Sequence, residues 1–121
     1  MHQVLDMSVV DELLSLSDDG DPELLLDLIQ LFLADGPAKV KSVVDGLGRQ
    51  DFDQMERAAH ALKGSAGNLG ARLLQEVCEN MQLATRKHEL AAVTQLTPQL
   101  ESQFAAARTA LEALQKRYTA V

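Results

Sequence analysis

The stretch Asp51–Gly70, which reads DFDQMERAAHALKGSAGNLG, decides the class of fold. Its apolar side chains recur at alternating spacings of three and four residues: Phe52, Met55, Ala59, Leu62, Ala66 and Leu69. Such spacing places them on one stripe of a helix and is typical of the seam of an antiparallel bundle. Asp51, followed three residues later by Gln54, predicts the N-terminal cap of this helix, and the sequence Asn68-Leu69-Gly70 predicts its end.

A short helix is predicted near the N-terminus of the chain. Ser8 is of a type that commonly caps helices, an acid follows it three residues later, and leucines then recur at helical spacing. The turn-forming sequence Asp18-Asp19-Gly20 ends this pattern. We therefore expect this helix over about 8–17.

A long helix is predicted between this segment and the stretch quoted above. Asp21 is expected to cap it and Pro22 to take its first position, because the missing N–H of proline would have no partner there in any case. The apolar pattern continues across Gly36-Pro37, which predicts a kink in one helix rather than two separate helices. Gly46 and Gly48 are expected to end it.

Two more helices are predicted on the C-terminal side. One ends in Arg86-Lys87-His88, where cations complement the helix dipole. Its apolar face consists of Leu73, Leu74, Val77, Met81 and Ala84. The other has Pro98 early in its pattern and Thr97 as a candidate cap, so a break near its start is expected. Its apolar residues are Val93, Leu96, Leu100, Phe104, Ala107, Leu111, Leu114 and Tyr118.

The turns between the four longer helices are short, so neighbouring helices must run antiparallel. We predict an all-α fold, an antiparallel up-and-down four-helix bundle with a short extra N-terminal helix. The composition agrees, since 46% of residues are hydrophobic and only 3% are aromatic, which suits helices packed by aliphatic side chains. With 121 residues and no linker or repeat, we expect one domain over 1–121, with the bundle at about 21–118.

Charge and cysteine content argue against several classes of function. Acidic residues number 18 and basic residues 11, and the formal net charge of −7 repels nucleic acid and anionic lipid, so neither nucleic-acid binding nor direct membrane contact is expected. No apolar run has the length of a membrane span, and the acidic start MHQVLDMSVVDE lacks the basic region of a signal peptide. One cysteine allows neither an internal disulfide framework nor a multi-cysteine zinc site, and a cytoplasmic location is predicted.

The common catalytic motifs are absent from the sequence: a GxxxxGKS or GxxxxGKT phosphate loop, a GxGxxG dinucleotide loop, an HExxH zinc motif and a GxSxG nucleophile elbow. Cys78 is interpreted as a partly buried structural thiol. His2 lies near the terminus and His88 at a predicted helix end. His60 differs from both, because at about 100° per residue it lies roughly 130° from the apolar stripe of its helix and must face outward.

The surroundings of His60 suit phosphoryl transfer. Glu56, Lys63, Gly64 and Gly67 lie within about 60° of it on the helix, which gives one cation, one acid and two missing side chains. A solvated imidazole is largely neutral near pH 7 and is then a nucleophile, and Lys63 would offset the charge of a phosphoryl group on the ring. Two mid-helix glycines together cost about 2 kcal/mol relative to alanine, so we expect them to permit a close approach by another protein or an oxyanion. An exposed histidine is more often simply solvated, and that interpretation stays open.

The sequence His60-Ala61-Leu62-Lys63-Gly64-Ser65-Ala66-Gly67-Asn68-Leu69-Gly70-Ala71 resembles the signature of histidine-containing phosphotransfer (HPt) domains. The likeness extends over 73–86 and, more loosely, to 21–23 and 32–33, so it covers most of the chain from about Asp21 to Tyr118. The resemblance implies a four-helix bundle, as the periodicity does independently. It also implies a phosphoryl carrier without an ATP site rather than an enzyme that acts alone.

The resemblance further implies a role for each of four residues. His60 would accept a phosphoryl group on a ring nitrogen from the phospho-aspartate of one receiver domain and pass it to the aspartate of another. Lys63 would offset the phosphate charge, and Gly64 would leave room for the group. Gln82 would reach the histidine or its phosphate from the adjacent helix, although Gln75 lies on the same helix and the choice between them stays open.

The same resemblance implies the partners, which are a response-regulator receiver domain and a hybrid sensor histidine kinase. No cofactor or metal is expected in this chain, since the Mg²⁺ of such relays belongs to the receiver domain. Whether the chain is a free-standing protein or a domain of a hybrid sensor kinase stays open. Two rival interpretations are a non-catalytic helical adaptor or dimerisation domain, and a carboxylate-type metal bundle, for which His88-Glu89 lacks the usual spacing.

The N-terminal part of the long helix is unusually apolar. Leucines together with Ile29 and Phe32 cover about 220° of its surface within 24–33, more than the stripe of an ordinary surface helix. Either the short first helix covers the excess, or part of it is exposed and gives a receiver domain an apolar surface beside His60. The sequence favours neither alternative.

Overall fold

A computed structural model describes residues 4–17 and 20–119 of the chain. Five helices make up this part of it: α1 (Met7–Ser15), α2 (Glu23–Arg49), α3 (Phe52–Asn68), α4 (Arg72–Arg86) and α5 (Leu90–Thr119). No strand occurs within these ranges, and the predicted all-α class is confirmed.

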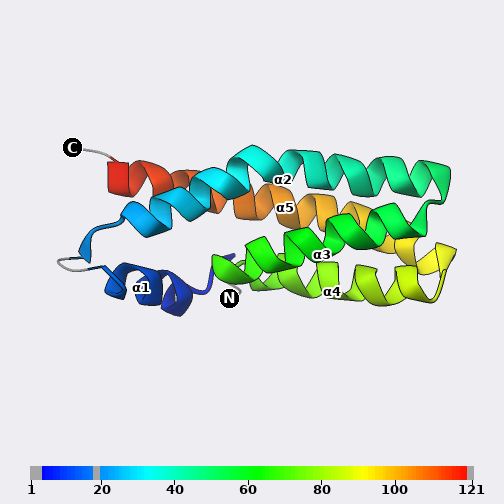
Figure 1. Ribbon diagram of the computed structural model, residues 1–121, viewed down its shortest axis with the longest axis horizontal. Helices are drawn as coiled ribbons and strands as arrows, with labels where there is room; N and C mark the ends of the chain where they lie inside the picture. Colours follow the sequence, from blue (N-terminus) through cyan, green and yellow to red (C-terminus); the bar gives the residue numbers. More distant parts are fainter. Residues whose placement is uncertain (1–3, 18–19, 120–121) are drawn as a thin grey trace.

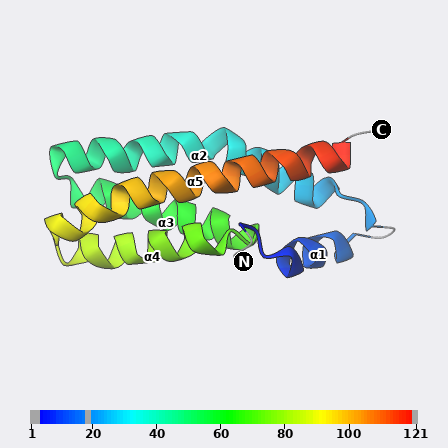
Figure 2. The same ribbon diagram turned by 180° about the vertical axis from the view of Figure 1, so that it is seen from behind.

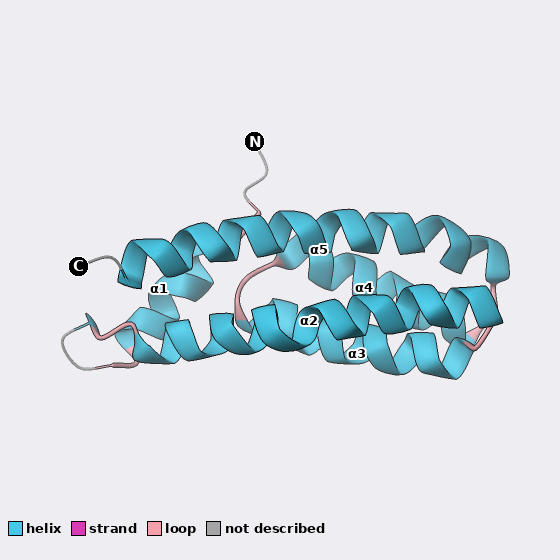
Figure 3. Ribbon diagram, turned by 90° about the horizontal axis from the view of Figure 1, so that it is seen from above, coloured by secondary structure: helices cyan, strands magenta, loops and turns pink. Residues whose placement is uncertain are grey.

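The four longer helices form a closed ring. Each packs on the next along the chain, and α5 returns to pack on α2, so the order around the ring is α2, α3, α4, α5. The helices run side by side along the length of the molecule and are joined by short turns at alternate ends (Figure 1, Figure 2). α1 lies at one end of the bundle and packs on α2 (Figure 3). The predicted antiparallel bundle with an extra N-terminal helix is therefore confirmed.

The cap of α1 is Asp6, and the prediction that Ser8 caps this helix is wrong. Oδ1 of Asp6 accepts a hydrogen bond from the Ser8 N–H at 3.0 Å and another from the Ser8 hydroxyl at 2.6 Å. Contacts distant in sequence hold Asp6 in place: its N–H donates to the Gly70 carbonyl at 2.8 Å, and Oδ2 accepts from Nε of Arg72 at 2.5 Å. These contacts tie the N-terminal segment to the turn between α3 and α4 and explain why the cap precedes the predicted one.

α1 ends at Ser15 rather than at 17, and Asp18-Asp19, which was expected to end it, lies outside the described residues. The start of α2 also differs by one position from the prediction. Pro22 is the residue before the helix rather than its first residue, and Oδ1 of Asp21 accepts from the Glu23 N–H at 3.0 Å. The Asp21 side chain therefore stabilises the start of the helix, as the sequence predicted.

α2 continues across Pro37 as one helix, in agreement with the prediction, and Figure 1 shows its axis changing direction near its middle. The expectation that Gly46 and Gly48 end it is wrong. The helix runs to Arg49, and Gln50 closes it with a left-handed φ of 55°. Gly46 is instead a packing position, because a Cβ there would lie 2.7 Å from Cγ of Met55 on α3.

α5 also runs unbroken across its proline, so the predicted break near Pro98 is wrong. Thr97 is not a cap: it is buried, and its hydroxyl donates to the Val93 carbonyl at 2.7 Å. Val93, in the first turn of the helix, is itself fully buried. The start of α5 is thus anchored in the core, which holds the helix together on both sides of the proline.

Aliphatic side chains fill the core, and the surplus of leucine on α2 is divided between core and surface. Leu25, Ile29 and Phe32 are buried, whereas Leu24 and Leu31 remain 37% and 58% exposed. Part of this apolar surface therefore stays exposed although α1 packs on α2. Among the described helices, none is long and apolar enough to cross a membrane.

Candidate functional site

His60 projects into solvent from the middle of α3. The imidazole lies on the side of this helix opposite the core. The buried residues of the helix are Met55, Ala58, Ala59, Leu62 and Ala66. Asp51 caps the helix by accepting from the Gln54 N–H at 3.0 Å, as predicted. A core histidine is thereby excluded, and the predicted outward orientation is confirmed.

Gln82 holds the imidazole from the side of α4. Its Nε2 lies 3.1 Å from Nδ1 of His60, and the Gln82 side chain is buried although the histidine is exposed. Gln75, the other candidate, lies next to Gly67, where an added Cβ would come within 2.9 Å of its Nε2. The structure thus places Gln82, not Gln75, against His60. Oε1 of Gln82 is buried and has no hydrogen-bond partner among the described residues.

Lys63 and Gly64 lie one helical turn beyond His60. Lys63 is half-buried, and its ammonium group makes no ion pair within the described ranges. At Gly64 an added Cβ would have no atom within 4 Å, so the surface beside the imidazole is open there. The structure therefore places Gln82 in contact with His60, while Lys63 and Gly64 follow His60 by three and four residues on the same helix.

Cys78 is fully buried on α4, more deeply than the partial burial that was predicted. Burial raises the pKa of its thiol to about 12, and the charge of Lys63 opposes this shift without cancelling it. A thiolate is the reactive form of cysteine, so this residue is no nucleophile at neutral pH. It belongs to the core and is no part of the site.

Two arginines beside His60 went unnoticed in the sequence. An open hollow of about 490 Å³ is lined by Asp53, Glu56, Arg57, His60, Gln82 and Arg86. Nε of Arg86 donates to Oε1 of Glu56 at 2.8 Å, which joins α4 to α3 one turn from the contact between His60 and Gln82. The prediction of a single cation near the imidazole is therefore wrong. The spacing of these residues could have predicted the pair of Glu56 and Arg86. Glu56 precedes His60 by four residues and Arg86 follows Gln82 by four, so each lies one helical turn from the contact between His60 and Gln82.

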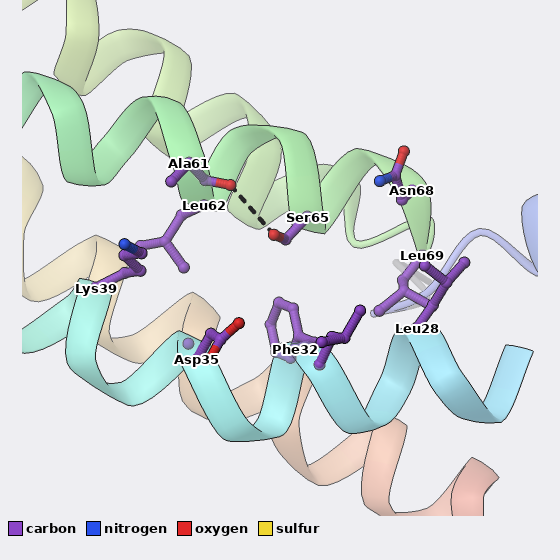
Figure 4. A pocket seen from close by; sticks show the side chains of 11 residues that line it. Leu28, Phe32, Asp35, Lys39, Ala61, Leu62, Ser65, Asn68 and Leu69 are labelled. Carbon is purple, nitrogen blue, oxygen red and sulfur yellow. Dashed lines mark hydrogen bonds between the residues drawn. The ribbon is translucent and has the colours of Figure 1, made fainter.

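A second hollow, of about 310 Å³, lies between α2 and α3 (Figure 4). Leu28 and Phe32 of α2 face Leu62, Ser65 and Leu69 across it. The hydroxyl of Ser65 donates to the Ala61 carbonyl at 3.2 Å and so stays on its own helix. This groove is lined largely by apolar side chains and lies beside the helix that carries His60.

The remaining histidines lie elsewhere. His88 stacks on Phe52 at the far end of α3, with ring centroids 4.6 Å apart, and His2 lies outside the described residues. Nowhere in the described ranges do three or more histidine, cysteine or acidic side chains cluster as they would around a metal ion.

Known proteins resemble this chain in sequence and in fold. A family model described as the Hpt domain matches residues 27–117. Histidine-containing phosphotransfer protein 2 of Arabidopsis thaliana is 26% identical over 104 residues, which make up 84% of this chain and 67% of that protein. Multistep phosphorelay regulator 1 of Schizosaccharomyces pombe is 29% identical over 80 residues, 66% of this chain but only 27% of its own length.

The crystal structure of histidine-containing phosphotransfer protein B from Pseudomonas aeruginosa PAO1 superimposes with a TM-score of 0.86. The two chains are 28% identical, and the match covers 98% of this chain and 99% of the other. The family match, the structural match and the exposed position of His60 are consistent with one another. The chain belongs to the Hpt domain family and has a histidine phosphotransfer role in phosphorelay.

Proposed function

We propose that His60 carries the phosphoryl group: it accepts the group from the phospho-aspartate of one receiver domain and passes it to the aspartate of another. The observation that carries the proposal is the contact of the buried Gln82 amide with Nδ1 of an exposed imidazole. This contact orients the ring from behind and leaves Nε2 accessible to a partner.

In the contact as the structure has it, the amide nitrogen of Gln82 can only donate to Nδ1, so the ring proton of a neutral His60 lies on Nε2. Attack by Nε2 needs its lone pair, so for this step the ring proton must lie on Nδ1. An Nδ1–H needs an acceptor, and Gln82 provides one when its amide turns by half a rotation and presents Oε1 to the ring. The turn gives the Nδ1–H to Oε1, which has no partner in the described part of the chain, and the amide nitrogen gives up its own contact in exchange. We infer that Gln82 is a positioning residue that selects the nucleophilic tautomer.

The transfer step needs little chemistry from this chain. Nε2 attacks phosphorus, the N–P bond forms as the bond from phosphorus to the aspartyl oxygen breaks, and the electron pair leaves with the carboxylate. Lys63, one turn away and not in an ion pair within the described residues, would offset the phosphoryl charge. Gly64 would leave space for the group and for the approaching partner, as the open surface at this position suggests.

The partners in this proposal are a response-regulator receiver domain and a hybrid sensor histidine kinase. Such a relay would take its phosphoryl groups from partner proteins rather than from ATP, would use Mg²⁺ bound by the receiver, and would operate in the cytoplasm. The groove of Figure 4 and the exposed Leu31 offer the receiver an apolar surface on which to dock.

Phosphotransfer from an isolated receiver domain tests the proposal. The receiver is phosphorylated with a small acyl phosphate in the presence of Mg²⁺ and mixed with the protein, and an acid-labile, base-stable label is followed. We expect labelling of the wild-type chain and of His88→Gln, which is the matched control because His88 is also exposed. His60→Gln should accept no label. Transfer that survives in His60→Gln would refute the assignment, and no transfer from a panel of receivers would favour the helical adaptor.

A further inference from the structure

The surface around His60 differs in charge from the rest of the chain. Besides the two hollows already described, a third of about 360 Å³ between α2 and α3 is lined by Ala38, Lys39, Ser42, Gln54, Arg57 and Ala58. Three bases and three acids line the three hollows together: Lys39, Arg57, Arg86, Asp35, Asp53 and Glu56. The lining of these hollows is therefore neutral overall and Lys63 beside His60 adds a positive charge, while the chain as a whole carries a formal charge of −7.

Of the three bases that line these hollows, Lys39 and Arg57 have no carboxylate partner in the described ranges, and the same holds for Lys63 beside His60. Arg86 is paired with Glu56, whereas neither Lys39 nor Arg57 has a carboxylate oxygen within 4.0 Å in the described ranges. Both side chains are exposed, Lys39 on α2 and Arg57 on α3. We call these two residues the cationic rim.

The cationic rim connects the apolar groove to the hollow at His60. Lys39 lines both the groove of Figure 4 and the third hollow, and Arg57 lines both the third hollow and the hollow that contains His60. A stable protein–protein interface covers about 800 Å² of each partner, or a disc roughly 16 Å in radius. A partner that covers His60 therefore also covers Arg57, which precedes it by less than one helical turn, and Lys39 lines the hollow next to it that Arg57 shares.

The chemistry of the proposed reaction defines the charge of that partner. A domain that holds both a divalent cation and a phosphorylated aspartate must surround them with carboxylates. We propose that Lys39 and Arg57 form a docking surface for the acidic mouth of a receiver domain and guide it onto His60. The inference rests on the proposed function and adds the residues that steer the encounter. An apolar groove alone cannot steer a partner, because it exerts no long-range electrostatic attraction.

Phosphotransfer kinetics at several ionic strengths test the docking surface. Transfer from a phosphorylated receiver domain is measured over a range of receiver concentrations for the wild type, Lys39→Glu, Arg57→Glu and the control Lys116→Glu. The control makes the same change of charge at an exposed position on α5, which packs on α2 and α4 rather than on the outward face of α3.

We expect either rim substitution to raise the half-saturating receiver concentration roughly tenfold at low salt. The effect should shrink to less than about twofold near 1 M salt, where the screening length is about 3 Å. Lys39→Glu should leave the maximal rate at saturating receiver unchanged, because steering alters encounter and not chemistry. Lys116→Glu should behave like the wild type.

Several outcomes would overturn this inference. Rim variants that keep the wild-type half-saturating receiver concentration and salt dependence would refute the docking surface. Transfer to these variants would still support His60 as the phosphoryl acceptor. An equal shift in Lys116→Glu would show an effect of net charge alone. Self-association of the chain that is abolished by Lys39→Glu would assign the surface to a second copy instead. Absence of transfer at every salt concentration would overturn the proposed function, and this inference with it.

Discussion

Replacing Gly64 by alanine should make the protein more stable and a poorer phosphoryl carrier. Gly64 lies within α3, and an added Cβ would meet no atom within 4 Å, so alanine gains its helical advantage without a steric cost. That advantage is about 0.5 to 1 kcal/mol in a helix interior. For a domain of this size it corresponds to a rise of about 2 to 5 °C in Tm, measured by circular dichroism.

The same methyl group should slow phosphotransfer. It projects one turn from His60 on the same face of the helix, into the space that the phosphoryl group and the receiver would occupy. A displacement of about 1 Å at a reacting centre can cost up to about a hundredfold in rate, so we expect at least a tenfold loss for Gly64→Ala and a larger loss for Gly64→Leu. The assay is the receiver-to-protein transfer described above, followed at fixed receiver concentration.

Gly48→Ala is the matched control for this prediction. Gly48 is also exposed and its Cβ would also meet open space, but it lies in the last turn of α2, away from the hollow at His60. It should gain no more stability than Gly64→Ala and should transfer at the wild-type rate. The reasoning fails if Gly64→Ala lowers Tm, or if it accepts phosphoryl groups as fast as the wild type does.

Three other substitutions or probes test the packing of the bundle. Gly36→Ala should lower the free energy of unfolding by about 1 to 2 kcal/mol in urea titrations, because the new Cβ would lie 2.5 Å from Cε1 of Phe104, whose ring is stacked on Phe32; wild-type stability would show that the ring moves aside freely. Cys78, with its pKa raised to about 12 by burial, should react with a thiol reagent at pH 8 only as fast as the protein unfolds, and immediate labelling would contradict its burial. Hydrogen bonds from Ser8 and Arg72 lower the pKa of Asp6 from 3.8 to about 2. The stabilisation of the folded protein by this carboxylate is therefore present above pH 4 and is lost as the pH falls towards 2. Asp6→Asn should abolish this part of the acid dependence of the unfolding free energy, and identical pH profiles of stability for the variant and the wild type would refute the assignment.

Periodicity predicted the helices well, and the local rules for their ends did less well. The stripe from Met55 to Ala66 is buried as expected, because helical spacing alone decides which side chains share a face. Ser8 failed as a cap because Asp6 is held by Gly70 and Arg72, contacts made across more than 60 residues. A choice between two capping residues two positions apart depends on such tertiary contacts, which no local pattern contains.

Gly46, Gly48 and Pro98 all lie inside helices although each is of a type that often marks a helix end. Gly46 is small because Met55 packs against it, and the helix closes instead at Gln50, a residue type with no strong preference for the left-handed region. Pro98 lies within a helix because Val93 on one side and Leu100 on the other are both fully buried. In each position packing outweighs the intrinsic preference of the residue.

At the candidate site the sequence identified the residues on α3 better than those from α4. His60, Lys63 and Gly64 are related by helical spacing, so their common location followed from the sequence alone. The choice of Gln82 over Gln75, and the pairing of Arg86 with Glu56, depends on the rotation of α4 against α3, which only the packed structure reveals.

His60 lies on a helix with defined ends and next to a buried glutamine, and this rigid setting affects how a signal could pass through the molecule. Because His60 lies inside α3, no loop of the described part of the chain adjoins it in sequence at which an added phosphoryl group would start a rearrangement. The loaded and empty proteins would then share one shape and differ mainly by about two negative charges at one point of the surface. The two forms of such a relay would differ in surface charge rather than in conformation, and a partner would distinguish them by charge alone.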